Sequence, residues 1–355
     1  MGDFSSPPLK REPGSASPAL LILSAGIIQK FKQGANVTTI VTLIGLGQIG
    51  ASIGLALRPY AGRIQRLGHD KNPEVSQWAR QLGAVDKVDF NLHHAVEPAD
   101  LVILALPAHE ILPTLAQIAP DLQAGAVVLE TSPLKTPLQA PAQEMIPAGR
   151  YFLGLVPTIS PALLTEPGHA PRADFFSHAT LGIVAPQGTP TEALKLVTDL
   201  AQLLQAEPFF LEAAEADSLM AAVHLLPQLM GVALLNLTTG RPGWSEGRRL
   251  AGRPYTGVIS APQETPESLA ALARLNRVSA LRVLDEALVE LQKLRAAVAA
   301  DDENELLDIL AGANQQGERW FQERQTGDWL AVEMGKKSLP ETPGFFGNLF
   351  GKRKK

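Results

Sequence analysis

The chain of 355 residues contains no cysteine, which excludes disulfides, thiolate metal sites and cysteine nucleophiles. It has no excess of basic residues either, because its formal net charge is −5, whereas nucleic-acid-binding proteins usually present a basic face. The longest early apolar run, residues 19–28, is about half as long as a membrane-spanning helix. We therefore expect no nucleic-acid partner and no membrane partner, while the absence of cysteine leaves the redox compartment open.

Several catalytic motifs are also absent. No group of histidines and carboxylates has metal-ligand spacing, so no metal is expected. The sequence contains neither the lysine-bearing phosphate loop nor the strand–turn–helix serine motif of hydrolases. Its 45% apolar and 19% charged residues are typical of a globular protein, and its length favours two domains.

The most informative feature that is present is a glycine-rich turn between an apolar, β-branched run and a helical pattern. The run VTTIVTLI is followed by Gly45, Gly47 and Gly50 in a GxGxxG spacing. In a dinucleotide-binding turn the first glycine permits the tight turn, the second admits the pyrophosphate, and the third lets the helix pack on the strand. Gln48 and Ile49 begin that helix, whose free N–H groups attract phosphate. The turn therefore predicts cofactor binding.

An acidic residue follows 25 positions after Gly45. Asp70 ends the next predicted strand, residues 64–69, where a carboxylate can accept hydrogen bonds from ribose hydroxyls. It favours NAD, because it would repel the 2′-phosphate of NADP. Lys71 would soften that repulsion, so NADP stays open as the alternative cofactor. Because enzymes that use a nicotinamide cofactor are normally cytoplasmic, we expect a cytoplasmic location.

Beyond Asp70 the sequence alternates between short apolar strands and helices, which predicts an α/β fold with a doubly wound parallel sheet of the Rossmann type. Ligands of such sheets bind beyond the carboxyl ends of the strands. Pro107 and Thr131 follow two of these strands and are therefore expected to line the cofactor crevice. The further strands are predicted at residues 101–106, 126–130, 151–155, 179–186 and 208–211.

The second half of the chain is predicted to be helical. An apolar helix is expected at residues 213–237, a long helix begins at Thr265, and another spans about residues 302–324. Apolar residues recur every three or four positions, so a face of these helices should be buried. We expect a homodimer formed through the C-terminal helices, with a self-contained helical core as the alternative.

These patterns divide the chain into four segments. Residues 1–36 form an extension whose start, rich in proline and serine, is expected to be disordered. Residues 37–212 form the Rossmann domain, and residues 213–335 form a helical substrate and dimerisation domain. Residues 336–355 form a basic tail.

The order of five motifs over roughly residues 37–330 resembles the prephenate/arogenate dehydrogenase family. The resemblance implies NAD(P)-dependent oxidative decarboxylation of a cyclohexadienyl acid in tyrosine biosynthesis, with a small-molecule substrate. It rests on the glycine turn, ETSPLK (residues 130–135), FLGLVP (152–157), DSLMAAVHLLPQ (217–228), and the helix that starts LNRVSALRVLDEAL (275–288) with its trailing GERW (317–320).

Several positions that carry the chemistry of this family hold other residues here. The family's histidine, which removes the substrate hydroxyl proton, corresponds to Val156, and its serine two residues before the motif lysine corresponds to Pro133. The family's arginine for the substrate carboxylate falls near Ser260, where no arginine stands, although Arg253 is close by.

His224 and Lys135 are the candidates for the missing catalytic groups. His224 lies one position before the family's helical histidine, and is either a replacement base or a core histidine. Lys135 follows a strand end, where its ammonium group could orient a carboxylate or the nicotinamide ribose. Ser132, Lys135 and Arg253 are expected to contact substrate. Two other functions stay open: a nicotinamide-dependent dehydrogenase of another small acid, and a non-catalytic NAD-binding regulatory dimer.

Overall fold

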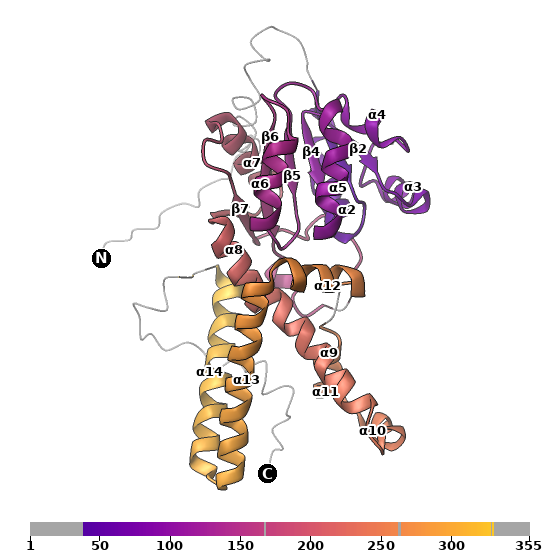
Figure 1. The fold of residues 1–355 in the computed structure, drawn as a ribbon. Coiled ribbons are helices and arrows are strands. Elements are labelled where there is room, and N and C mark those ends of the chain that lie inside the picture. Colours follow the sequence, from indigo (N-terminus) through magenta and orange to yellow (C-terminus); the bar gives the residue numbers. More distant parts are fainter. Residues whose placement is uncertain (1–37, 167, 262–263, 328, 330–355) are drawn as a thin grey trace, which may run out of the picture.

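The computed structural model describes residues 38–166, 168–261, 264–327 and 329. The predicted extension and basic tail lie outside these residues. An α/β part forms one end of the molecule, and helices project from beneath it (Figure 1).

A single eight-stranded sheet forms the centre of the α/β part, with the strand order β3-β2-β1-β4-β5-β6-β7-β8. The first six strands are parallel, β7 is antiparallel to β6, and β8 is parallel to β7. The predicted parallel, doubly wound sheet is thus confirmed for its first six strands and wrong for the last two, which reverse direction. The strands are β1 (Thr39–Ile44), β2 (Ile64–His69), β3 (Lys87–Val88), β4 (Leu101–Leu104), β5 (Val127–Glu130), β6 (Tyr151–Pro157), β7 (Thr180–Val184) and β8 (Glu207–Phe210).

Helices cover both faces of this sheet. Short 3₁₀ turns follow α2 (η2, Arg58–Tyr60), α5 (η3, Ala119–Asp121) and β6 (η4, Pro161–Leu163). The covering helices are α2 (Gln48–Leu57), α3 (Pro73–Leu82), α4 (Leu92–Val96), α5 (Ala108–Ile118), α6 (Thr136–Met145) and α7 (Thr191–Leu203).

The strands supply two apolar cores, because neighbouring residues of a strand face opposite sides of the sheet. Leu43, Ile103 and Leu129 pack in one core with residues of α2, α3 and α7. Val102 and Leu104 pack in the other with residues of α4, α5 and α6. A sheet covered on both faces buries both sides of its central strands, which is why β4 (LVIL) is a continuous apolar run in the sequence.

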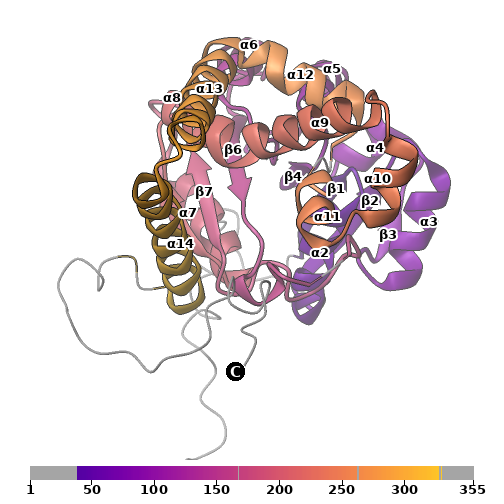
Figure 2. The same ribbon diagram turned by 90° about the horizontal axis from the view of Figure 1, so that it is seen from below.

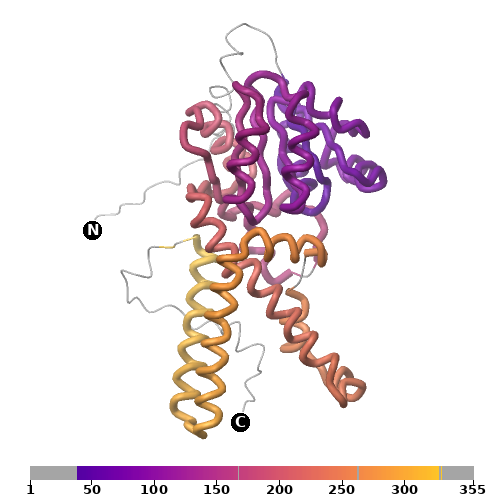
Figure 3. The backbone as a smooth tube through the Cα atoms, viewed as in Figure 1, coloured from indigo at the N-terminus to yellow at the C-terminus, as the bar shows by residue number. Residues whose placement is uncertain are grey.

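The helical part begins after β8. In it, α8 (Ala213–Met220) passes through a π-helical turn (Ala221–Leu225) into α9 (Leu226–Thr239). The short helices α10 (Trp244–Leu250) and α11 (Arg253–Ile259) follow, α12 (Pro266–Leu275) lies below the sheet, and α13 (Arg277–Ala300) and α14 (Glu303–Thr326) form a long hairpin (Figures 1 and 3).

The long helix predicted from Thr265 is two helices. Asn276 interrupts it with a non-helical backbone (φ −107°, ψ 40°), and its amide donates a hydrogen bond of 2.8 Å to the carbonyl oxygen of Asp217. Leu269 and Leu272 consequently pack in a third core together with Ala108 of α5, whereas α13 turns away from the sheet.

Candidate functional site

The first and third glycines of the turn after β1 are required by close backbone approach. Gly45 has a φ of +86°, and a Cβ there would lie 2.3 Å from the carbonyl oxygen of Ala105. A Cβ on Gly50 would lie 2.0 Å from the carbonyl oxygen of Gly45. At Gly47, in contrast, no described atom lies within 4 Å of the Cβ position. The second glycine therefore faces open space, as a turn that admits a pyrophosphate requires.

Asp70 lies against this turn at the end of β2. Its Oδ2 accepts a hydrogen bond of 2.8 Å from the backbone N–H of Leu46, and its Oδ1 accepts one of 2.9 Å from Asn72. Lys71 points elsewhere, because its Nζ lies 2.6 Å from Oε1 of Glu110 on α5, and this hydrogen bond raises the pKa of Lys71. The acid predicted from the sequence thus stands beside the glycine turn, and the neighbouring lysine is paired with another carboxylate.

The other predicted cofactor residues follow strand ends at the same edge of the sheet. Pro107 immediately precedes α5, and Thr131 donates its backbone N–H to the carbonyl oxygen of Leu104 at the end of β4. Gln48 lines a cavity of about 100 Å³ with residues that follow β6, among them Ile159. The ends of β1, β4, β5 and β6 therefore meet at the edge that faces the helical part (Figure 2).

Lys135 is 2% exposed, and its ammonium group is occupied inside the protein. Its Nζ donates to the carboxylate of Glu130, to the carbonyl oxygen of Ser132 at 2.6 Å and to that of Leu155 at 2.7 Å. These three acceptors account for all three N–H groups of an ammonium. Burial raises the pKa of Glu130 and lowers that of Lys135, and the ion pair opposes both shifts.

The surroundings of Lys135 join the two parts of the chain. Asp217 of α8 accepts the backbone N–H of Lys135 at 2.6 Å and that of Thr136 at 3.0 Å, so a carboxylate caps the start of α6. The Ser132 hydroxyl is buried and donates to the carbonyl oxygen of Leu134 at 2.9 Å. Two of the three side chains expected to contact substrate, Ser132 and Lys135, are turned into the protein, which favours a structural role for them.

His224 lies in the π-helical turn, within a polar cluster at the junction of the two parts. Its Nε2 is 3.4 Å from Oε1 of Glu264 and 3.2 Å from the amide nitrogen of Gln228. The backbone N–H of Glu264 donates to Oε1 of Gln228 at 3.1 Å, which fixes the orientation of that amide. Ser268 donates to the other oxygen of Glu264 at 2.6 Å. Glu264 is a residue that the sequence pattern did not identify.

Charge and burial distinguish this cluster from ordinary core. The hydrogen bond from His224 lowers the pKa of Glu264, so this carboxylate is held in its charged form. His109, at the start of α5, adds a second imidazole, whose buried Nδ1 has no hydrogen-bond partner among the described residues. His224 is only half-buried, so a carboxylate-oriented imidazole at the junction can act as a base.

The position of the family's strand-end histidine is apolar. Val156 is buried with Val184 and Ala216 in a small core between the sheet and α8, against which Leu211 and Met220 pack. This position offers no proton acceptor.

Arg253 stands apart from the junction cluster. It is exposed at the start of α11, a helix tied to α9 by a 2.8 Å hydrogen bond between Tyr255 and Thr238. Within the described part of the chain it forms no ion pair with the junction residues.

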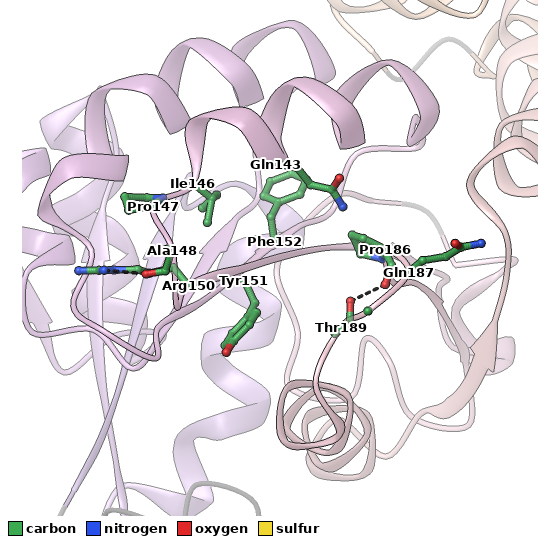
Figure 4. Close-up of a pocket in the computed structure, with 11 residues that line it drawn as sticks. Gln143, Ile146, Pro147, Ala148, Arg150, Tyr151, Phe152, Pro186, Gln187 and Thr189 are labelled. Carbon is green, nitrogen blue, oxygen red and sulfur yellow. Dashed lines mark hydrogen bonds between the residues drawn. The ribbon is translucent and has the colours of Figure 1, made fainter.

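A cavity of about 180 Å³ lies elsewhere, beside the start of β6 and the end of β7 (Figure 4). Its lining is largely uncharged, and the guanidinium of Arg150 donates to the carbonyl oxygens of Leu122 and Ala148. No predicted site residue lines this cavity.

Two family models match the chain on either side of the β8–α8 boundary. The model described as prephenate dehydrogenase, nucleotide-binding domain, matches residues 53–208, and the model described as prephenate dehydrogenase, dimerization domain, matches residues 212–312. Together they span more than half of the chain. The chain belongs to the prephenate dehydrogenase family.

Relatives of this family are similar over most of their length. Cyclohexadienyl dehydrogenase of Zymomonas mobilis is 26% identical over 273 residues, which cover 76% of this chain and 91% of that protein. Prephenate dehydrogenase of Bacillus subtilis is 23% identical over 269 residues, or 75% and 72% of the two chains.

Solved structures of the family share the fold. Prephenate dehydrogenase from A. aeolicus, in complex with hydroxyphenyl propionate and NAD+, has a TM-score of 0.70 at 18% identity and covers 80% of this chain and 98% of that one. Synechocystis arogenate dehydrogenase has a TM-score of 0.63 at 22% identity, with 79% and 100% covered. The Rossmann domain followed by a helical domain, predicted from the sequence, is thus the fold of the family.

Proposed function

We propose that this protein is an NAD-dependent dehydrogenase that oxidises and decarboxylates a cyclohexadienyl acid, prephenate or arogenate, in tyrosine biosynthesis. The observation that carries the proposal is the match of both family domains to a chain with an open glycine turn beside Asp70. The apolar environment of Val156 favours one alternative, a protein of this family that binds NAD without turnover.

The described residues fit a dinucleotide. Gly47 opens the turn to a pyrophosphate, and Asp70 stands where ribose hydroxyls can donate to it. Because Lys71 is paired with Glu110, its charge is not free to offset the repulsion between Asp70 and a 2′-phosphate. We therefore propose NAD, and not NADP, as the cofactor.

We expect substitution of Gly47 to affect cofactor binding, and substitution of Gly50 to affect the stability of the fold. Gly47→Val should weaken NADH binding about tenfold or more and leave the melting temperature nearly unchanged, because the side chain occupies only the space for the pyrophosphate. Gly50→Ala should destabilise the fold by about 1–3 kcal/mol, because its Cβ overlaps the Gly45 carbonyl. Fluorescence titration with NADH and thermal unfolding measure the two effects. Equal losses of stability would contradict this assignment.

The chemistry requires a base at the hydroxyl group of the substrate. When bound, NAD accepts the hydride from the hydroxyl-bearing ring carbon. His224, oriented by Glu264, is the described residue best placed to take the hydroxyl proton. The ring carboxylate then leaves as carbon dioxide, and its bonding electrons complete the aromatic ring.

Incubation of the purified protein with NAD and prephenate or arogenate tests the proposal through the absorbance of NADH. We expect turnover of at least one of the two acids, and a KM for NAD raised about tenfold or more in the Gly47→Val variant. Binding of NAD without turnover of either acid would favour the non-catalytic alternative. Turnover of only a different small acid would favour the other-substrate alternative.

We propose that the protein is a homodimer formed through its helical part. Five apolar side chains of the α13–α14 hairpin are each close to half exposed in the single chain, which is unusual for leucines that follow one another along a helix. The continuous helix Ala213–Thr239 is apolar enough to cross a membrane by length and composition, a property it shares with core helices of soluble proteins. A second copy would cover these surfaces, in keeping with the matched dimerization domain. The five side chains are Leu281, Leu288, Leu291, Leu307 and Leu310.

Light scattering coupled to size-exclusion chromatography tests this interface. We expect a dimer for the wild type, and a monomer for the double variant Leu281→Glu/Leu288→Glu, because two buried charges would oppose association. Phe90→Glu, an equally exposed apolar position on the α/β part, is the matched control and should stay dimeric. A monomeric wild type would disprove the proposal.

A further inference from the structure

Three cationic side chains are buried in the described part of the chain, and two of them have carboxylate partners. Arg66 donates through Nε and Nη2 to Asp86, and through Nη1 to two carbonyl oxygens. Lys135 is paired with Glu130. The third, Arg324 of α14, is 8% exposed, and no described carboxylate lies within 4.0 Å of it. Leaving a charge buried without a counter-charge is costly, so such a residue points to a function.

Among the described residues, a single nitrogen of the Arg324 guanidinium forms hydrogen bonds. Nη2 donates to the hydroxyl of Thr158 at 2.9 Å and to the carbonyl oxygen of Ile159 at 2.6 Å. Nε and Nη1 have no hydrogen-bond partner among the described residues. The lowered pKa of Arg324 reflects its removal from water. The two hydrogen bonds fix the plane of the guanidinium group. Its Nε and Nη1 can then donate to a planar anion such as a carboxylate.

Arg324 lies at the edge of the sheet where ligands of such folds bind. Thr158 and Ile159 directly follow β6, at the sheet edge beyond which ligands of parallel strands bind. Val156, which corresponds to the family's strand-end histidine, lies only two residues before Thr158. The end of α14 reaches this edge from the helical part (Figure 1). The helical part thus contributes a cation to the ligand-binding edge of the α/β part.

We propose that Arg324 binds a carboxylate of the substrate and supplies the cation that is lacking near Ser260. The proposal rests on the proposed function for its substrate class. The carboxylate it binds is the one at the end of the side chain, not the ring carboxylate that is attached to the same ring carbon as that side chain. A strong ion pair to the ring carboxylate would stabilise the ground state of the group that must leave, and would slow decarboxylation.

A purely structural role would make Arg324 a clamp between α14 and the segment after β6. Its neighbour Gln325 has such a contact, because its amide donates to the carbonyl oxygen of Pro161 at 3.2 Å. Gln325→Ala therefore serves as the matched control, since it removes a clamp from the same helix end and no charge.

Calorimetric titration of the NAD-loaded protein with 3-(4-hydroxyphenyl)propionate and with its uncharged amide tests the proposal. We expect Arg324→Gln to weaken binding of the acid by roughly 10- to 100-fold and to leave binding of the amide unchanged. Arg324→Lys should keep part of the preference for the acid, and Gln325→Ala all of it.

Three results would overturn the proposal: no preference of the wild type for the acid, equal losses for acid and amide in Arg324→Gln, or the same loss in Gln325→Ala. The steady-state constants separate this proposal from the proposed function. If neither prephenate nor arogenate is oxidised and the acid preference still depends on Arg324, the proposed function fails alone. If one of them is oxidised with unchanged KM in Arg324→Gln, the assignment of Arg324 fails alone.

Discussion

Replacing His224 with alanine is expected to lower kcat for the cyclohexadienyl acid by about 10²–10⁴-fold. That factor corresponds to roughly 3–5 kcal/mol of transition-state stabilisation. The reason is that hydride can leave the ring carbon only as the hydroxyl proton is removed, and Val156 cannot accept a proton. His224, held by Glu264 and Gln228, is the base that the junction offers. Initial rates of NADH formation at saturating substrate measure the loss.

The controls for this experiment come from the same cluster and from the surface. Glu264→Gln should cause a smaller loss of kcat than His224→Ala, because the carboxylate orients the imidazole but does not itself take the proton. His94→Ala, an exposed histidine of α4, should retain full activity. Unchanged kcat in His224→Ala would remove this residue from the mechanism, while the dehydrogenase assignment would depend on another base.

Replacing Lys135 with methionine is expected to lower the free energy of unfolding by about 3–5 kcal/mol, because it leaves the carboxylate of Glu130 buried and unpaired. The backbone carbonyls of Ser132 and Leu155 would lose their donor as well. Urea-induced unfolding, followed by fluorescence, measures the change.

The double variant Lys135→Met/Glu130→Gln is the informative control. Removing both charges should recover much of the lost stability, because the desolvated carboxylate is gone. The expectation from sequence, that Lys135 contacts substrate, makes the opposite prediction for the single variant: a normally stable protein with low activity. Normal stability of Lys135→Met would therefore contradict the structural role.

Local patterns were sufficient to predict the parts of the fold that depend on local interactions. The six residues of β2 were predicted with their observed bounds, because the alternation of buried and partly exposed side chains is encoded within a few residues. The glycine turn was predictable for the same reason. Asp70 was found by its spacing from that turn, and lies beside it.

Features that depend on contacts between distant segments could not be predicted in this way. The ammonium group of Lys135 is paired with Glu130 of the same motif. Its backbone N–H, however, donates to Asp217 of α8, which is 82 residues away in the sequence. Arg324 meets Thr158 across 166 residues, and His224 meets Glu264 across 40. The antiparallel direction of β7 could not be predicted either, because an apolar run fits a parallel and an antiparallel strand equally well. These contacts decide the site, which explains why the fold was easier to predict than the chemistry.

The π-helical turn at residues 221–225 acts as a register adjustment in the helix that carries the candidate base. Such a turn accommodates one residue more than an α-helix would, and one residue corresponds to a rotation of about 100°. Within this wider turn, His224 lies beside Glu264 and Gln228 at the junction of the two parts. The imidazole is therefore carried by a segment whose backbone departs from regular α-helix, so a change that restores α-helical geometry there would rotate it away from Glu264.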